Sequence, residues 1–135
     1  MRSLSRIPMR ENVRTSSTTA TPDAAWALVG DFAGIGKVFA DVSDVVVVDD
    51  VRTFSLMGMR LSERMVARDE AARSLTYSII DGVPGIESHS ATIQVAGEGD
   101  GCEITWTVEA DPEAAQPIFA DAYRGALQSL HGSLG

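Results

Sequence analysis

The stretch that decides the fold runs from Ser62 to Gly82 and reads SERMVARDEAARSLTYSIIDG. Its second half places Leu75, Tyr77 and Ile79 on one face of a strand and small hydroxyl residues on the other. The first half alternates in the same way and is separated from the second by a polar, alanine-containing segment that suits a turn. The stretch therefore predicts two antiparallel strands with one covered face.

The same alternation extends in both directions along the chain. We predict further strands over residues 11–20, 44–50, 51–58, 86–100 and 101–111, with the central pair at 59–69 and 73–82. Residues 21–32 predict a short helix, because Thr21 suits an N-cap and Pro22 the first helical position, and 33–42 predict a second short helix or turn. Residues 113–134 have apolar side chains three and four positions apart, which predicts a long helix.

These elements define an α+β fold. We expect a seven-stranded, curved antiparallel sheet wrapped around the long C-terminal helix, with two short helices after the first strand. Strands that curl around a single helix cannot close tightly everywhere, so we also expect a cavity between sheet and helix. Residues 1–10 are expected to be a flexible N-terminal arm, and 11–135 one ligand-binding domain.

Composition excludes several classes of function. The net charge of −8 argues against nucleic acid and against docking on an anionic membrane, and no apolar run approaches the length of a membrane span. Cys102 is the only cysteine, which excludes an internal disulfide, and the N-terminal segment lacks the apolar core of a signal peptide, so a cytoplasmic location is expected. With two histidines and no carboxylate at ligand spacing, we expect no metal and no cofactor.

Glu63 lies on the apolar face of its predicted strand, where a carboxylate needs an explanation. If Met57 and Gly58 form a two-residue turn, Arg52 lies opposite Glu63. If the next turn centres on Glu70, Glu63 lies opposite Tyr77.

The third hairpin extends the same arithmetic. If its turn centres on Val83, Tyr77 lies opposite His89. Four strands would then carry a polar row on the apolar side of the sheet, and we take its members as the candidate catalytic residues: Arg52, Glu63, Tyr77 and His89.

The row has a chemical and a structural interpretation. Arg52 could hold Glu63 ionised, Tyr77 could donate to a carbonyl or enolate, and His89 could move protons near neutral pH. Cyclisation or dehydration of a β-keto substrate needs such a set of groups. The same four residues could instead form a hydrogen-bonded network in a cavity wall, with no ligand contact.

The order of elements and four segments resemble the START-like, or SRPBCC, superfamily of helix-grip proteins. The segments are AAWALVGDF, SERMVARDEAARSLTYSIIDG, SHSATIQV and GCEITW, and the resemblance covers roughly residues 12–134. Members of that superfamily include polyketide cyclases, lipid carriers, pollen allergens and plant abscisic-acid receptors. The resemblance implies a ligand pocket with Glu63, Tyr77, His89 and Ala91 in its wall.

The chain departs from the hormone receptors in three places. Residues 55–59 (SLMGM) lack the proline of their gate loop, and residues 83–86 (VPGI) replace a latch loop that carries His and Arg. The single lysine, Lys37, falls in a helical stretch, so no lysine can be matched to the one that binds the hormone carboxylate in the receptors. These departures argue against hormone sensing, while ligand enclosure remains implied.

Candidate ligand-contact residues come from the apolar sheet face, the turn near Met59, the last helix and the resemblance. They are Phe54, Leu56, Met59, Leu61, Met65, Ala91, Trp106, Phe119 and Tyr123. We expect a hydrophobic or aromatic small molecule, polyketide-like or lipid-like, bound by a monomer or a homodimer. Cofactor-free cyclase, aromatase or dehydratase chemistry is the first hypothesis, a non-catalytic carrier or sensor the second, and a heterodimerising module with a vestigial cavity the third.

Overall fold

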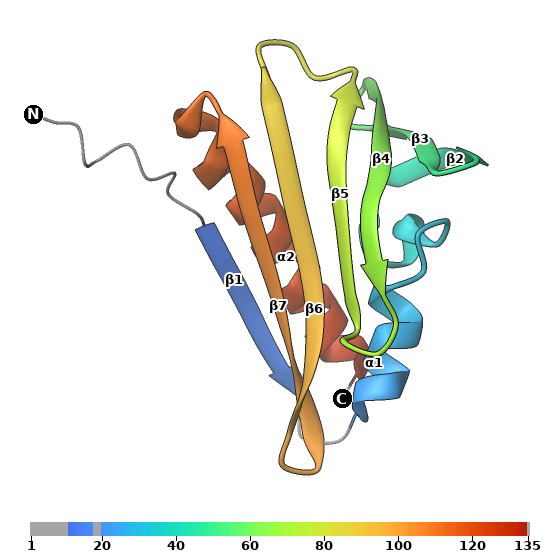
Figure 1. Cartoon of the computed structure of the whole chain (residues 1–135), viewed down its shortest axis with the longest axis vertical. Coiled ribbons are helices and arrows are strands. Elements are labelled where there is room, and N and C mark those ends of the chain that lie inside the picture. Colours follow the sequence, from blue (N-terminus) through green and yellow to red (C-terminus); the bar gives the residue numbers. More distant parts are fainter. Residues whose placement is uncertain (1–10, 18–19, 135) are drawn as a thin grey trace, which may run out of the picture.

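The computed structural model describes residues 11–17 and 20–134 (Figure 1), so the predicted arm at 1–10 lies outside the described residues. The predicted α+β helix-grip fold is confirmed. The elements, in chain order, are β1 (Glu11–Ser17), α1 (Pro22–Val29), the 3₁₀ helix η2 (Ile35–Lys37), β2 (Val42–Val48), β3 (Val51–Leu56), β4 (Met59–Asp69), β5 (Ser74–Asp81), β6 (Ser88–Glu98), β7 (Gly101–Asp111), the 3₁₀ helix η3 (Glu113–Ala115) and α2 (Gln116–Leu134).

The strands form a seven-stranded antiparallel sheet in the order β1-β7-β6-β5-β4-β3-β2. Apart from β1, each strand pairs with its neighbours along the chain, and β1 closes on β7 at the far edge. The alternation seen in the sequence decides the faces, since Leu75, Tyr77, Ile93 and Ile104 are buried while their neighbours are more exposed. Helix α2 lies behind the sheet and packs mainly on β1 and β7 (Figure 1).

Helix α1 fills one end of the space beneath the sheet. Its N-cap is Thr21, whose side chain accepts a hydrogen bond from the Ala24 backbone N–H at 3.1 Å. Trp26 points into the core and donates from its indole Nε1 to Glu70 at 2.8 Å, while the Arg68 guanidinium lies 4.8 Å from the Trp26 ring centroid. These contacts fix α1 to the turn between β4 and β5.

The core is solid at the α1 end and hollow at the other. The main cluster combines α1, the middle of the sheet and the C-terminal half of α2, including Val29, Val95 and Leu127. A smaller cluster of Ile35 and Phe54 with their neighbours lies towards β3 and β4. No described helix fills the space between this small cluster and the first turns of α2, and the cavity lies there.

The first predicted hairpin register is confirmed. Residues 57 and 58 form the two-residue turn, and Arg52 pairs with Glu63. Met57 and Gly58 both have positive φ, at 51° and 81°, which is the conformation required by the tight turns that match sheet twist.

The second and third predicted registers are wrong. Glu63 pairs with Ile79 rather than Tyr77, because the turn spans residues 70–73 and a register shift between Met65 and Ala67 lies between that turn and Glu63. Tyr77 pairs with Ala91 rather than His89. In both cases the partner moves by two residues, and because side chains alternate with a period of two, the predicted face is kept. The polar residues therefore share a face but are staggered, not aligned in a row.

Candidate functional site

A cavity of about 470 Å³ lies between the sheet and the N-terminal half of α2. This volume is in the range of small-molecule sites. The described residues that line it are Ile35, Phe39, Phe54, Leu56, Met59, Leu61, Glu63, Tyr77, Ile79, Val83, Pro84, Gly85, Ile86, Pro112, Ala114, Ala115, Ile118, Phe119, Ala122 and Tyr123. Of these, Glu63, Tyr77 and Tyr123 carry polar side-chain groups, so the wall is otherwise apolar.

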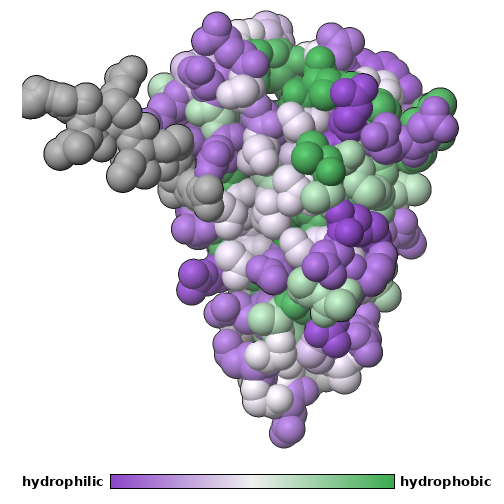
Figure 2. Space-filling model, in the orientation of Figure 1, coloured by the Kyte–Doolittle hydropathy of each residue, from purple (hydrophilic) through white to green (hydrophobic). Residues whose placement is uncertain are grey.

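The mouth of the cavity lies between the β5–β6 loop and the start of α2. Most lining residues that are also exposed come from the β5–β6 loop and from residues 112–118, including Pro84, Gly85, Pro112 and Ile118, and the exposed fraction of Ile118 is 71%. Hydrophobic surface gathers at this end of the molecule (Figure 2). A ligand could enter between these segments without unfolding the sheet.

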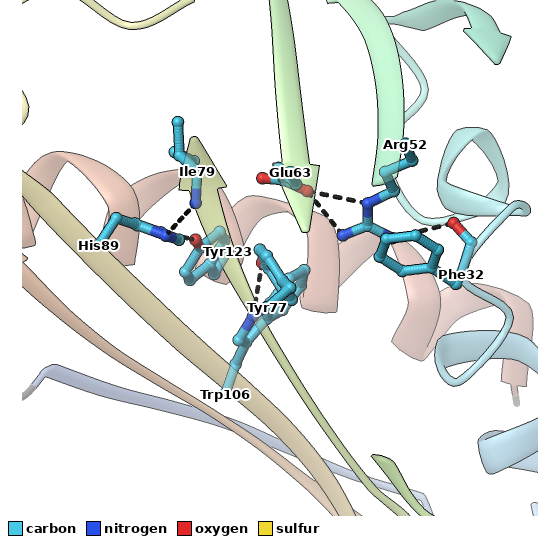
Figure 3. Close-up of polar contacts among 8 residues, drawn as sticks. All are labelled: Phe32, Arg52, Glu63, Tyr77, Ile79, His89, Trp106 and Tyr123. Carbon is cyan, nitrogen blue, oxygen red and sulfur yellow. Dashed lines mark hydrogen bonds and ion pairs between the residues drawn. The ribbon is translucent and has the colours of Figure 1, made fainter. Parts of the chain in front are cut away.

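Glu63 is buried in the cavity wall and uses one of its two carboxylate oxygens. Its Oε1 accepts from Arg52 Nε at 2.9 Å and from Arg52 Nη2 at 2.7 Å. The other oxygen, Oε2, has no hydrogen-bond donor among the described residues and points away from Arg52 (Figure 3). Burial raises the pKa of Glu63, and the attraction of Arg52 partly offsets this rise.

Arg52 lies behind Glu63 rather than in the cavity. Its Nη1 donates to the Phe32 carbonyl at 3.0 Å, and its guanidinium lies 4.3 Å from the Phe32 ring centroid and 4.7 Å from that of Tyr77. The guanidinium thus contacts two rings, a carbonyl and a carboxylate, and the exposed fraction of the whole Arg52 residue is 4%. From behind the wall, Arg52 holds the Glu63 carboxylate in place and offsets part of its buried charge.

His89 also lies behind the wall, and its hydrogen bonds fix its tautomer. The Ile79 backbone N–H donates to Nδ1 at 3.1 Å, and Nε2 lies 3.1 Å from the Tyr123 hydroxyl (Figure 3). Burial lowers the pKa of His89 to about 4, so the ring is neutral near pH 7. A neutral ring that accepts at Nδ1 carries its proton on Nε2 and donates it to Tyr123.

The hydroxyl groups of the two tyrosines each accept a hydrogen bond from the layer behind the wall. Trp106 Nε1 donates to the Tyr77 hydroxyl at 3.1 Å, and His89 Nε2 donates to the Tyr123 hydroxyl at 3.1 Å. No described residue within hydrogen-bond distance accepts the hydrogen of either hydroxyl. Burial raises the pKa of both Tyr77 and Tyr123, so both stay protonated. Because both residues line the cavity, their hydroxyl groups are the candidate hydrogen-bond donors to a ligand.

Trp106 supports this pair without lining the cavity. Its ring stacks on that of Tyr123 with 4.1 Å between centroids and 2° between planes, and its N–H holds Tyr77. Ala91 and Met65 also lie outside the lining, since Ala91 is buried in the core and Met65 packs against it.

The structure thus divides the candidate residues from the sequence into two groups. The cavity wall contains Glu63 and Tyr77 of the candidate catalytic residues, while Arg52 and His89 form the layer behind it. It also contains six of the candidate ligand contacts, namely Phe54, Leu56, Met59, Leu61, Phe119 and Tyr123. Sequence reasoning missed the wall residues of the β5–β6 loop and of η3, because loop residues have no periodicity that would assign them to a face.

Two further observations concern metals and membranes. Across the described ranges, 11–17 and 20–134, no three His, Cys, Asp or Glu residues are grouped so that they could hold a metal ion. No helix in the same part of the chain is long and apolar enough to cross a membrane.

Fold and cavity together define a helix-grip domain with an internal apolar site. The chain belongs to the polyketide cyclase / dehydrase and lipid transport family, whose model matches residues 9–134. This confirms the resemblance to the START-like superfamily and indicates binding of a hydrophobic small molecule. No curated protein gave a significant sequence match.

Solved structures show the same fold. A protein from Thermobifida fusca is 26% identical, with a TM-score of 0.74 and coverage of 93% of this chain and 94% of that one. An uncharacterized protein from Bacillus thuringiensis is 19% identical, with a TM-score of 0.83 and coverage of 93% and 98%. A START superfamily protein from Mycobacterium smegmatis is 8% identical, with a TM-score of 0.76 and coverage of 93% and 96%.

Proposed function

We propose that this protein binds an apolar or aromatic small molecule in the cavity between the sheet and α2. The observation that carries the proposal is a cavity of about 470 Å³ whose apolar wall contains one carboxylate oxygen of Glu63 without a described donor and the hydroxyl groups of Tyr77 and Tyr123. An apolar wall supplies the affinity for a hydrophobic body through burial of its surface. The polar groups in the wall would orient the polar end of the ligand, because a buried polar group favours only ligands that form a hydrogen bond with it.

The proposal is tested by filling the cavity. Ala122 lines the cavity from α2 and is exposed at its rim, so Ala122→Trp can place an indole in the mouth with little disturbance of the core. Gln128→Trp is the matched control, since Gln128 is exposed on the same helix and does not line the cavity. Binding of the neutral fluorescent probe N-phenyl-1-naphthylamine, measured by titration, should weaken at least about tenfold in the first variant, which is about 1.4 kcal/mol.

The control should bind the probe as the parent does. Equal binding by the parent and Ala122→Trp would show that the probe does not occupy this cavity. Native mass spectrometry of the purified protein adds a second readout, because a co-purified compound should be present in the parent and in Gln128→Trp and absent from Ala122→Trp.

A second candidate function, acid–base catalysis, is favoured by the position of Glu63 beside the tyrosine pair. The raised pKa of Glu63 makes its carboxylate a stronger base than an exposed one, and a tyrosine hydroxyl of the pair can donate to an oxyanion. In this proposal Oε2 takes a proton from the carbon next to a ligand carbonyl, and the hydroxyl stabilises the enolate. The protonated carboxyl then returns the proton to a leaving hydroxyl, which departs as water.

Proton removal can be measured without the natural substrate. Deuterium incorporation next to the carbonyl of 2-tetralone, followed by NMR in D₂O, should be accelerated by the protein and lost in Glu63→Gln. Because either tyrosine can supply the hydroxyl, Tyr77→Phe and Tyr123→Phe should each retain activity, and the double variant should lose about 100-fold or more. Acceleration that survives Glu63→Gln would exclude Glu63 as the base, and the binding proposal would stand alone.

A further inference from the structure

The charge that faces the cavity is negative, and nothing in the described wall balances it. Glu63 is the one charged residue among the described lining residues. The nearest cation, Arg52, is on the far side of that carboxylate, with Nε and Nη2 on Glu63 Oε1 and Nη1 on the Phe32 carbonyl. A ligand in the cavity therefore meets Oε2 before it meets any positive charge.

Other cations near this region are engaged elsewhere. Lys37 pairs with Asp31 at 3.4 Å on the surface. Arg60 donates from Nη1 to the Asp44 carbonyl and the Ser55 hydroxyl, and neither Arg60 nor Lys37 lines the cavity.

We propose that the cavity selects uncharged ligands that donate a hydrogen bond, such as alcohols, phenols and arylamines, and excludes carboxylates, sulfonates and phosphates. This inference rests on the proposed binding function and specifies its ligand class. A neutral donor can bond to Glu63 Oε2 while its own oxygen or nitrogen, or a nearby carbonyl, accepts from the tyrosine pair. An anionic head group placed at the same point is repelled by the Glu63 carboxylate and gains only a hydrogen bond from a neutral tyrosine hydroxyl.

The size of the discrimination follows from Coulomb's law. Two like charges about 4 Å apart at an effective dielectric constant of about 20 lower the affinity by about 1,000-fold. The attraction of the more distant Arg52, relaxation, and proton uptake by Glu63 each reduce this effect. We therefore expect a neutral ligand to bind at least about 100-fold more tightly than an anionic one of the same shape.

Two fluorescent probes with the same aromatic frame provide the test. N-phenyl-1-naphthylamine is neutral, and 8-anilino-1-naphthalenesulfonate adds a sulfonate that stays charged. Both are titrated into the full chain at about 0.5 M salt, where the general negative charge of the protein is screened. Tight binding of the amine with binding of the sulfonate at least about 100-fold weaker supports the inference.

The other outcomes separate the two proposals. Equal binding of both probes in the cavity, judged by loss of both in Ala122→Trp, would overturn the selection and leave the binding function standing. Binding of neither probe would overturn the binding function and the selection with it.

The cause of the discrimination is tested by titrating or removing Glu63. The groups that face it are Arg52 from β3, Tyr77 from β5 and Tyr123 from α2, with His89 behind Tyr123. Both tyrosines stay protonated, burial raises the pKa of Glu63 and lowers that of His89 to about 4, so on acidification Glu63 takes up a proton before His89 does. The sulfonate should bind more tightly as the pH falls from 8 to 5, while the amine shows no such change.

Glu63→Gln should abolish this pH dependence and strengthen sulfonate binding, because Arg52 would then lack its counter-ion. A sulfonate affinity that is the same at pH 5 and pH 8 and is unchanged by Glu63→Gln would overturn the role of Glu63. The pH series on the parent protein requires no substitution, so it decides the point even if the variant fails to fold.

Discussion

Arg52→Met is the substitution that tests most directly how the buried carboxylate is maintained. The side chains of Arg52 and Glu63 have exposed fractions of 5% and 7%, so methionine would leave a charge with no partner in an apolar wall. Methionine keeps most of the side-chain volume and the contacts with the Phe32 and Tyr77 rings. The loss is therefore mainly electrostatic.

The loss of stability in Arg52→Met can be estimated from the contacts that the substitution removes. Removing one partner of a buried ion pair costs about 3–5 kcal/mol, and the Phe32 carbonyl loses its donor at about 1 kcal/mol. The double variant Arg52→Met/Glu63→Leu removes both charges, so we expect its stability to lie within about 2 kcal/mol of the parent. A domain of this size has a total stability of about 5–15 kcal/mol, so the single variant should be close to unfolding.

Urea unfolding at pH 7.5 measures the free energy of unfolding of the two variants. Repeating the measurement at lower pH tests whether the unpaired charge of Glu63 causes the loss. The pKa of Glu63 is already raised in the parent and rises further without Arg52. A carboxyl group whose pKa is higher in the folded than in the unfolded state destabilises the native state at high pH. This destabilisation is relieved as the pH falls through the folded-state pKa, because the carboxyl group is then protonated. Arg52→Met should therefore regain stability on acidification. Equal destabilisation of the single and double variants at every pH would refute this reasoning.

Two further substitutions test the layer behind the wall and the turn beside it. Because the pKa of His89 is lowered from 6.5 to about 4, the parent should lose about 3 kcal/mol as the pH falls from 6.5 to 4, and urea unfolding of His89→Asn should lack this loss. Gly82 has φ of 97°, and a Cβ there would lie 2.3 Å from the Arg60 carbonyl oxygen and 2.6 Å from Leu61 Cα. Gly82→Ala should therefore displace β4 and lower both the stability of the protein and its affinity for the probe. Gly58→Ala is its control, because a Cβ at Gly58 meets nothing within 4 Å and should cost only about 1–2 kcal/mol of backbone strain, with probe binding unchanged.

The fold could be predicted from the sequence because the alternation of side chains carries it. The sequence predicts the faces of Tyr77 and Glu63 correctly although it misplaces their partners across β4–β5 and β5–β6, since an error of two residues keeps the face of a strand. The β5 partner of Glu63 depends on the length of the turn at 70–73 and on the register shift between Met65 and Ala67, and the β6 partner of Tyr77 depends on the β5–β6 loop. Local sequence thus determines which side chains point inward, while the turns determine which of them meet.

The layering of the site could not be predicted in the same way. The sequence indicates that His89 points inward, but only the three-dimensional packing of α2 places Tyr123 between His89 and the cavity. Likewise, the hairpin pairs Arg52 with Glu63, but the position of Phe32 behind them depends on the loop that follows α1. Contacts between elements distant in the chain are set by packing, which periodicity does not encode.

The most direct test of the binding site is a crystal structure of the protein with N-phenyl-1-naphthylamine. Both ring systems of the probe should lie in the cavity between β4 and α2, with the amine nitrogen about 3 Å from Glu63 Oε2. A probe bound on the outer surface, or in the cavity with its nitrogen directed away from Glu63, would contradict the proposed binding site.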